Sequence, residues 1–198
     1  MKRILIVGAG GQIGSELTTY LRKIYGASNV VATDVRECGK LAEGGPFEVL
    51  NALDAKAMAS VVERYKIDAI FNLVALLSAV GEKNPQTAWN INIGALMNAL
   101  EVAREYGCAL FTPSSIGAFG PTSPKDKTPQ DTIMQPTTIY GVCKVTGELL
   151  GNYYFQRYGV DTRSVRFPGI ISNVTLPGGG TTDYAVEIYY EAIKAGRF

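Results

Sequence analysis

The chain has 198 residues, 46% hydrophobic and 19% charged, which is enough to bury the core of one domain and part of a second. A formal net charge of +1 gives no electrostatic signature of binding to nucleic acid or to a membrane surface. The sequence contains no histidine, which excludes a Ser-His-Asp triad, a Cys-His pair and a His-ligated metal. Any general base must therefore be Asp, Glu, Lys, Tyr or a Cys thiolate.

The three cysteines, Cys38, Cys108 and Cys143, lie far apart and form no CxxC motif, so we expect reduced thiols that pack in the interior. Only four apolar residues separate the N-terminal Met-Lys-Arg from Gly8, too few for a signal peptide, and no apolar run approaches the length of a membrane span. We expect a cytoplasmic protein with no resident metal and no nucleic-acid or membrane partner.

Short β-branched segments alternate with longer helical patterns along the whole chain. In chain order, the pattern predicts strands over residues 4–7, 30–34, 47–50, 69–74, 109–112 and 162–167. Helices are expected from the first glycine-rich turn to about residue 25 and over residues 55–65, 87–106 and 138–158, with a long polar loop over residues 121–136.

Strands that are apolar on both faces and separated by helices require a parallel sheet covered on both sides. We therefore predict an α/β fold, a Rossmann-like doubly wound parallel sheet, over residues 1–166. The composition turns glycine-rich after Arg166, so residues 167–198 are expected to begin a smaller C-terminal substrate lobe.

A glycine-rich turn, GAGGQIG, follows the first predicted strand. Its GxxGxxG spacing places Gly8, Gly11 and Gly14 where a positive φ, a close approach of the backbone to a pyrophosphate and tight packing of helix on strand are needed. With Gln12 and Ile13, at the start of a helix whose first N–H groups are free, they form a candidate cofactor site. The alternative is a tight turn without a ligand, which the position at the first strand–helix junction disfavours.

Asp34 ends the second predicted strand, 20 residues after Gly14. An acid at this place accepts hydrogen bonds from the hydroxyls of the adenosine ribose and repels a 2′-phosphate, so NAD is favoured over NADP. Arg36 lies two residues later and would soften that preference, and a solvated turn aspartate is the alternative for Asp34. Asn51, just after the third strand, is placed to meet the adenine edge.

Tyr140 and Lys144 lie four residues apart, on one face of a predicted helix. A tyrosine, with a pKa of about 10, is a poor base at neutral pH, but nearby cations favour its phenolate. The ammonium of Lys144 and a bound nicotinamide are therefore expected to lower the pKa of Tyr140 by roughly three units.

The same YxxxK spacing occurs again at Tyr190 and Lys194, so the spacing alone does not identify a site. Tyr140 opens the helix after the fifth strand, and Ser115 lies 25 residues earlier, just past the C-terminal end of that strand. Both residues then lie at the edge of a parallel sheet where ligands bind. We interpret Tyr140 as catalytic and Tyr190 as ordinary helix packing.

With GAGGQIG, Asp34, Ser115 and the Tyr140/Lys144 pair, the whole chain resembles the extended short-chain dehydrogenase/reductase family. The resemblance implies that Tyr140 is the proton-transfer base, that Lys144 holds the nicotinamide ribose and tunes the tyrosine, and that Ser115 orients the substrate oxygen. It also implies an NAD cofactor with further contacts from Ala52, Leu73, Ala75, Asn92 and Pro168. A helix-packing amide is an equal alternative for Asn92.

Three segments, residues 113–121, 166–172 and 177–185, resemble the members of that family that oxidise L-threonine. The resemblance implies oxidation of the threonine 3-hydroxyl to 2-amino-3-ketobutyrate, so the expected partner is a small amino-acid substrate. Substrate contacts are expected from Ser78, Ser115, Tyr140, Gly180, Thr181 and Thr182. Many of these enzymes carry Thr at the position of Ser115, and the exchange keeps the hydroxyl.

Members of the family continue into a C-terminal lobe that closes over the substrate, whereas this sequence ends at Phe198. We therefore expect part of the substrate pocket to lie beyond the chain. The resemblance also implies a homodimer formed through the long helices that hold Asn92 and Tyr140.

Two other functions stay open. A nucleotide-sugar epimerase or dehydratase uses the same cofactor core, but its diphosphate substrate needs cationic partners, and no Lys or Arg occurs between Phe167 and Ile193. A protein that senses NAD without turning it over is the third possibility, and it has no need of Ser115, Tyr140 and Lys144 in register.

Overall fold

The computed structural model describes residues 2–172, 176 and 183–197. Its main sheet has six parallel strands in the spatial order β3-β2-β1-β4-β5-β7, and a separate two-stranded sheet pairs β6 with β8. The strands are β1 (Ile4–Val7), β2 (Val30–Asp34), β3 (Phe47–Val49), β4 (Ala69–Asn72), β5 (Ala109–Phe111), β6 (Ser114–Ser115), β7 (Thr162–Arg163) and β8 (Arg166–Phe167). The main sheet has the 3-2-1-4-5-6 order of a Rossmann-type fold, which confirms the predicted α/β class.

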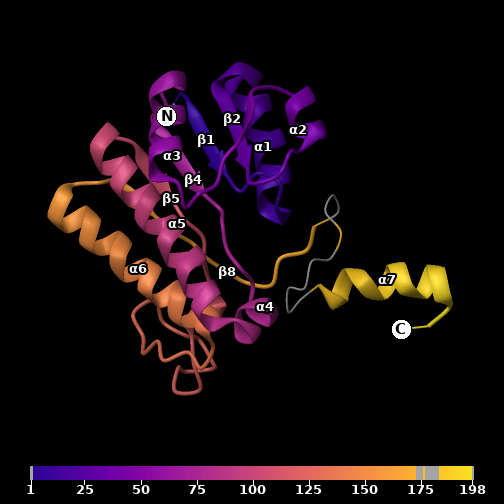
Figure 1. Cartoon of the computed structure of the whole chain (residues 1–198). Coiled ribbons are helices and arrows are strands. Elements are labelled where there is room, and N and C mark those ends of the chain that lie inside the picture. Colours follow the sequence, from indigo (N-terminus) through magenta and orange to yellow (C-terminus); the bar gives the residue numbers. More distant parts are fainter. Residues whose placement is uncertain (1, 173–175, 177–182, 198) are drawn as a thin grey trace.

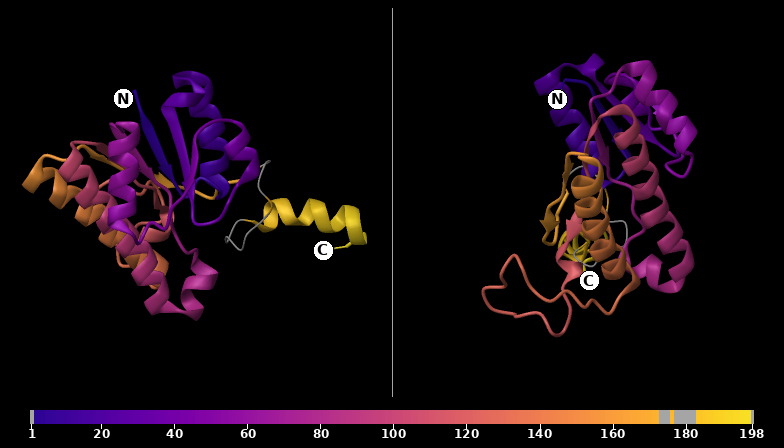
Figure 2. Two further views of the ribbon diagram at one scale, coloured as in Figure 1. Left: turned by 45° about the horizontal axis from the view of Figure 1, so that its top comes forward. Right: turned by 90° about the vertical axis from the view of Figure 1, so that its left-hand side faces the viewer.

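Helices cover both faces of the sheet (Figure 1). They are α1 (Gln12–Tyr25), α2 (Gly39–Glu43), α3 (Ala55–Tyr65), α4 (Ser78–Lys83), α5 (Pro85–Tyr106), α6 (Ile139–Tyr158) and α7 (Tyr184–Ala195), with 3₁₀ turns at Ala27–Asn29 and Ile116–Ala118. α1 and α2 lie on one side of the sheet and α3, α5 and α6 on the other, where α5 packs along α6 (Figure 2).

The alternation of side chains along β1 builds a separate core on each face of the sheet. Ile4 and Ile6 pack in a cluster with Leu21 of α1, whereas Leu5 and Val7 belong to the larger core beneath α3 and α5. All four side chains of the strand are fully buried, as a central strand of a doubly covered parallel sheet requires.

The sequence predicts one strand over residues 162–167, and this prediction is wrong. The structure divides the segment into β7, at the edge of the main sheet, and β8, which pairs with β6. The division lies opposite Pro113, which has no N–H to donate to a ladder. The amides of Thr112 and Ser114 on either side of it do donate to the β7–β8 segment, at 3.0 and 2.9 Å. The small β6–β8 sheet therefore separates from the main sheet where the candidate site forms.

The sequence pattern does not predict α2 and α4, whereas the helix expected around Tyr190 is present as α7. α2 and α4 have five and six residues, too few to show a helical period. α7 lies apart from the sheet in Figure 1 and in the left view of Figure 2, and none of its described residues is buried. Several of its large apolar side chains are exposed: Tyr184, Ile188, Tyr189, Tyr190 and Ile193.

Candidate active site

The glycine-rich turn between β1 and α1 has the close contacts that a phosphate cradle requires. Gly8 has a φ of +85°, a conformation that favours glycine. A Cβ on Gly14 would lie 2.3 Å from the carbonyl oxygen of Gly8, so α1 can approach β1 this closely only with glycine there. Gly11 is the N-cap of α1, and the free N–H groups of the following turn make this helix end suitable for an anion.

Asp34 fastens the end of β2 to this turn. Its Oδ2 accepts a hydrogen bond from the amide of Gly10 at 2.9 Å, and its Oδ1 accepts one from the amide of Arg36 at 3.3 Å. The side chain is half-buried, which disfavours the solvated turn aspartate, whereas Arg36 is exposed. The carboxylate thus lies beside the backbone that would approach the adenosine end of a dinucleotide.

Asp34→Asn should weaken NAD binding by about 10- to 100-fold, because a charged acceptor for the ribose hydroxyls is lost. It should weaken NADP binding less, since the repulsion of a 2′-phosphate is lost as well. Calorimetric titration with both dinucleotides measures the two dissociation constants. Glu37→Gln, which neutralises an exposed carboxylate three residues away, is the control. An unchanged ratio of the two constants in Asp34→Asn would contradict the role of Asp34 in cofactor choice.

Asn51 and Ala52 are engaged locally and do not line the main cavity. Asn51 Oδ1 accepts a hydrogen bond from the amide of Leu53 at 3.0 Å, in a turn that leads to the Asp54 N-cap of α3. Ala52 is buried, and its carbonyl accepts a bond from Asn98 Nδ2 at 2.9 Å. The adenine contact of Asn51 and the cofactor contact of Ala52 stay predictions, and the hydrogen bonds of both residues hold the β3–α3 connection.

A cavity of about 600 Å³ opens at the carboxyl ends of β1 and β4. The strand order of the sheet reverses between these two strands, and ligands bind at such a point in doubly wound folds. The predicted site residues that line it are Gly8, Gly11, Gln12, Ile13, Gly14, Leu73, Ala75, Ser78, Ser115, Tyr140, Lys144 and Pro168. Gly180, Thr181 and Thr182 lie outside the described residues, so their expected substrate contacts stay predictions.

Tyr140, Lys144 and Ser115 come together on one wall of this cavity. The N-cap Thr138 accepts a hydrogen bond from the amide of Gly141 and starts α6, which places Tyr140 in the first turn and Lys144 one turn later. Lys144 Nζ donates to the carbonyl of Pro113 at 2.7 Å and lies 5.3 Å from the centroid of the Tyr140 ring. The strand β6 that begins after this carbonyl carries the Ser115 hydroxyl to Tyr140.

The electrostatics of Tyr140 differ from the expectation that neighbouring cations lower its pKa. Burial raises the pKa of the Tyr140 phenol, and a hydrogen bond with Ser115 opposes this increase only in part. Desolvation also lowers the pKa of the Lys144 ammonium to about 8. Lys144 is held at the Pro113 carbonyl, so its charge alone does not outweigh the burial of the phenol in the protein without its cofactor.

The lowered pKa of Lys144 predicts a stability increment that grows with pH. The folded chain releases this proton near pH 8 and the unfolded chain keeps it until about pH 10.5, so the unfolded state binds more protons between these values. Across that window, the free energy of unfolding should rise by up to about 3 kcal/mol relative to Lys144→Met. Urea unfolding at a series of pH values measures it, with the exposed Lys56→Met as control. A difference from Lys144→Met that does not change with pH would contradict the buried ammonium.

The side chain of Asn92 forms two hydrogen bonds to the segment that follows β4. Its Oδ1 accepts a hydrogen bond from the amide of Leu76 at 2.7 Å, and its Nδ2 donates to the carbonyl of the same residue at 3.2 Å. This paired contact holds the segment in which Ala75 and Leu77 line the main cavity. The arrangement favours the helix-packing amide for Asn92, which acts on the site through Leu76.

Tyr190 lies on a helix, α7, as expected, but it is 40% exposed, so its ring is only partly packed against the described residues. The nitrogen of Lys194 lies 5.9 Å from the centroid of its ring, close to the corresponding distance in the Tyr140 pair. Two similar Tyr–Lys pairs thus differ in surroundings, since Tyr140 lines the main cavity and Tyr190 does not.

Residues 4–195 match the family model described as the NAD dependent epimerase/dehydratase family. The chain belongs to this family. It is 60% identical over 200 residues to an uncharacterized epimerase/dehydratase of Staphylococcus haemolyticus, covering 100% of this chain and 63% of that protein. The match confirms the predicted family resemblance and identifies NAD as the cofactor of the family.

Two solved L-threonine dehydrogenases have similar structures. The enzyme from Clostridium difficile is 56% identical with a TM-score of 0.95, and the match covers 100% of this chain and 63% of that one. A GalE-like enzyme from Cupriavidus necator, in its holo form, is 53% identical with a TM-score of 0.92, covering 96% and 62% of the two chains. The chain thus spans slightly less than two thirds of the length of these relatives.

Several residues that line the main cavity are not among the site residues predicted from the sequence. They include Leu77, Ile116, Gly117, Phe119, Thr137, Thr138, Phe167, Ile170 and Asp183. Gln12 Nε2 donates to the carbonyl of Ile170 at 3.4 Å, which joins α1 to the segment after β8. No local pattern signals this contact, because the two residues are 158 positions apart.

The described residues meet the requirements of neither a membrane-spanning helix nor a metal site. No helix there is long and apolar enough to cross a membrane. The same residues contain no group of three or more His, Cys, Asp or Glu side chains that could hold a metal ion.

Proposed function

We propose that this chain forms the cofactor-binding and catalytic part of an NAD-dependent dehydrogenase that oxidises the 3-hydroxyl of L-threonine to 2-amino-3-ketobutyrate. The proposal is carried by one observation: Ser115, Tyr140 and Lys144 share the wall of a cavity whose floor is the glycine-rich turn. The similarity to solved L-threonine dehydrogenases supports the choice of substrate.

The bound NAD supplies a hydride acceptor for C3 of the substrate. The residues of the chain handle the proton: the phenolate of Tyr140 takes it at Oη from the 3-hydroxyl as the carbonyl forms, and Ser115 Oγ holds the substrate oxygen beside it. A bound nicotinamide cation would add to the charge of Lys144 and favour this ionised form of Tyr140 against its burial. Lys144 keeps a positive charge near the Tyr140 ring and fixes the backbone before Ser115 through the Pro113 carbonyl. The sequence has no histidine, and the ammonium of Lys144 donates to a backbone carbonyl, so we assign the base to Tyr140, which lies beside Ser115.

The charges around the cavity favour an amino acid over a nucleotide diphosphate. Among the described lining residues, the charged side chains are Lys144 and Asp183, and the ammonium of Lys144 already donates to a backbone carbonyl. A diphosphate needs several cationic partners, whereas an amino acid carries one charge of each sign. Ser78, at the start of α4, adds a hydroxyl to the same wall.

The decisive test adds NAD and L-threonine to the purified chain and follows the appearance of reduced nicotinamide. Parallel reactions contain L-serine, D-threonine or a UDP-hexose. Turnover that requires L-threonine supports the proposal, and turnover of the UDP-hexose alone would replace it with the epimerase alternative. If the chain binds NAD but turns over none of these substrates, the assay is repeated on this chain extended by the C-terminal segment of its relatives. Activity of the longer chain would support the dehydrogenase, and continued inactivity would favour a sensor.

Two features outside the cavity support the remaining expectations. Residues 167–198 are proposed to begin a substrate lobe, because α7 exposes apolar side chains that such a lobe would cover.

Val142, Leu149 and Tyr153 form an exposed apolar stripe along α6, which supports the proposed homodimer through α5 and α6. Equilibrium sedimentation of the purified chain tests the dimer.

A further inference from the structure

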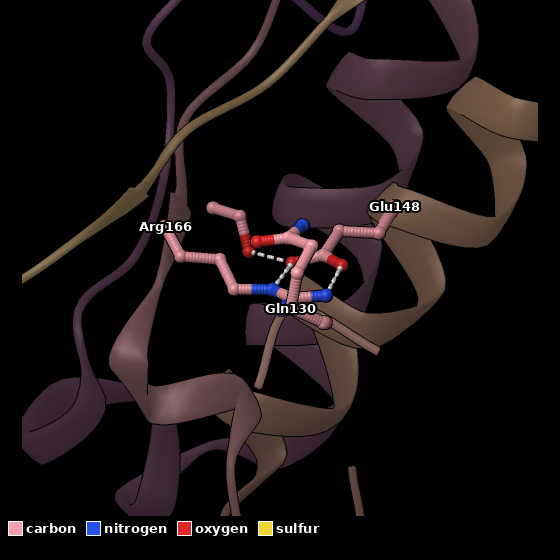
Figure 3. Close-up of polar contacts among 4 residues, drawn as sticks. Gln130, Glu148 and Arg166 are labelled. Atoms are coloured by element: carbon pink, nitrogen blue, oxygen red, sulfur yellow. Dashed lines mark hydrogen bonds and ion pairs between the residues drawn. The ribbon is translucent and has the colours of Figure 1, made fainter. Parts of the chain in front are cut away.

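A charged pair lies behind the catalytic wall, on the same face of α6. Tyr140, Lys144 and Glu148 follow one another at intervals of four residues, so they form one line along the helix. The first two line the main cavity, and Glu148 lies one turn beyond them. Figure 3 shows its carboxylate facing the guanidinium of Arg166 from β8.

The contacts of Glu148 are short and directional. Oε2 lies 2.7 Å from Arg166 Nη2, and Oε1 accepts a hydrogen bond from Arg166 Nε at 2.9 Å. The hydroxyl of Ser114 donates to the same Oε1 at 2.5 Å. The two charged side chains are only 14% and 16% exposed, so this two-pronged pair is largely removed from water.

Arg166 extends the contact to two further segments. Its Nη1 donates to the carbonyl of Gln130 at 2.9 Å, in the long loop before α6 (Figure 3). Its guanidinium also lies 5.3 Å from the centroid of the Phe119 ring, and Phe119 lines the main cavity. The Glu148 carboxylate thereby binds β6 through Ser114 and β8 through Arg166, and Arg166 in turn binds the loop.

These contacts reach the site through the next residue in each strand. Ser114 precedes Ser115, and Arg166 precedes Phe167, which lines the cavity. β6 and β8 have two residues each and pair with each other, so their ladder is too short to hold Ser115 firmly. Successive turns of α6 hold successive residues before Ser115: Lys144 binds the Pro113 carbonyl and Glu148 binds the Ser114 hydroxyl.

We propose that Glu148 is a positioning residue, which sets the Ser115 hydroxyl and the β8 wall of the cavity against Tyr140 through Ser114 and Arg166. The inference rests on the proposed function, because it takes Ser115 and Tyr140 as parts of the reaction. Tyr140 and the groups that fix Ser115 lie on one rigid helix, so their spacing does not depend on the loop connecting β6 to α6. A displacement of about 1 Å at such a site is enough to cost on the order of 100-fold in rate.

The test compares Glu148→Ala, Glu148→Gln and the control Asp161→Asn. Asp161 forms the same kind of two-pronged pair with Arg163, at 2.9 and 3.0 Å, but in solvent and away from the cavity. Glu148→Ala should lower kcat for L-threonine by about 10- to 100-fold while KM for NAD changes by less than about threefold. Glu148→Gln should recover only part of the rate, because its amide oxygen can still accept from Ser114 and Arg166 Nε while its NH2 group cannot accept from Arg166 Nη2. Asp161→Asn should match the wild type.

Amide hydrogen exchange provides a readout that needs no substrate. The amides of Ser114 and Gly117 donate to the carbonyl of Val165 and to Ser115 Oγ, at 2.9 and 3.1 Å. In Glu148→Ala they should exchange at least about tenfold faster, beyond any change in global unfolding, and in Glu148→Gln the increase should be smaller, because an acceptor for Ser114 remains. Unchanged exchange, or a fall in kcat no larger than in Asp161→Asn, would overturn the proposal. If neither this chain nor the same core joined to the C-terminal segment of its relatives oxidises L-threonine, the proposed function fails, and the exchange rates still decide whether Glu148 positions this segment.

Discussion

Tyr140→Phe is expected to reduce the turnover of L-threonine by at least about 1,000-fold. The substitution removes one oxygen and keeps the ring, so the packing of the first turn of α6 should persist. The ionised oxygen of Tyr140 is the group that receives the substrate proton, and the chain has no histidine to replace it. The dissociation constant for NAD should change by less than about threefold, because the glycine-rich turn and Asp34 are untouched.

Steady-state kinetics and calorimetric NAD titration check this expectation, and Tyr190→Phe is the matched control. Tyr190 also has a lysine four residues later with its ammonium near the ring, but it lies on α7, outside the wall of the main cavity. Its variant should keep the rate of the wild type. An active Tyr140→Phe would exclude Tyr140 as the base, and equal losses in both variants would mean that neither loss reports on proton transfer.

The comparison of these two tyrosines indicates what the sequence can predict about the site. The order of strands and helices places Tyr140 and Ser115 at the same sheet edge, because parallel strands present their carboxyl ends together. The sign of the pKa change is a tertiary property. It depends on how deeply the phenol is buried and on where Lys144 donates its hydrogen bond, and local sequence contains neither quantity.

The fold likewise has features that local sequence predicts and features that depend on tertiary contacts. Buried strands such as β1 are predictable because a short continuous run of apolar, mostly β-branched residues is typical of a strand that is covered on both faces of a parallel sheet. The separation of β7 from β8 depends on Pro113, about 50 positions away between β5 and β6, and a scan of residues 162–167 alone cannot detect it. The pair of Glu148 and Arg166 is equally nonlocal, since it joins a helix to a strand in another layer.

Gly14→Ala should reduce both the stability of the fold and its affinity for NAD. The new Cβ would lie 2.3 Å from the carbonyl oxygen of Gly8 and 2.7 Å from Ala9 Cα. Both neighbours are backbone atoms that cannot rotate away, so α1 must move off β1. We expect the free energy of unfolding to fall by about 1–3 kcal/mol, as in overpacked cores. Displacement of the N-terminus of α1 should also weaken NAD binding by at least about 100-fold, since the phosphate cradle is lost.

Gly11→Ala separates the two roles that the glycines of this turn are expected to have. A Cβ at Gly11 would meet its nearest neighbour, the Gly8 carbonyl oxygen, at 3.5 Å, which is an ordinary contact. The fold should therefore lose no more than about 1 kcal/mol, the usual cost of alanine at an N-cap. NAD affinity should still fall by about tenfold or more, because the methyl group occupies the surface that the pyrophosphate approaches.

Denaturant unfolding and calorimetric titration of both variants measure this separation, with Gly39→Ala as control. Gly39 lies in α2, and a Cβ there would meet no atom within 4 Å, so both the stability and the affinity of that variant should equal or exceed those of the wild type. If Gly11→Ala bound NAD as tightly as the wild type, the turn would be a tight strand–helix junction and not a phosphate cradle. If Gly14→Ala alone lost affinity, the binding surface would depend on the position of α1 but would not include the backbone at Gly11. A loss in both, with instability confined to Gly14→Ala, is the result that a cradle built on a closely packed helix requires.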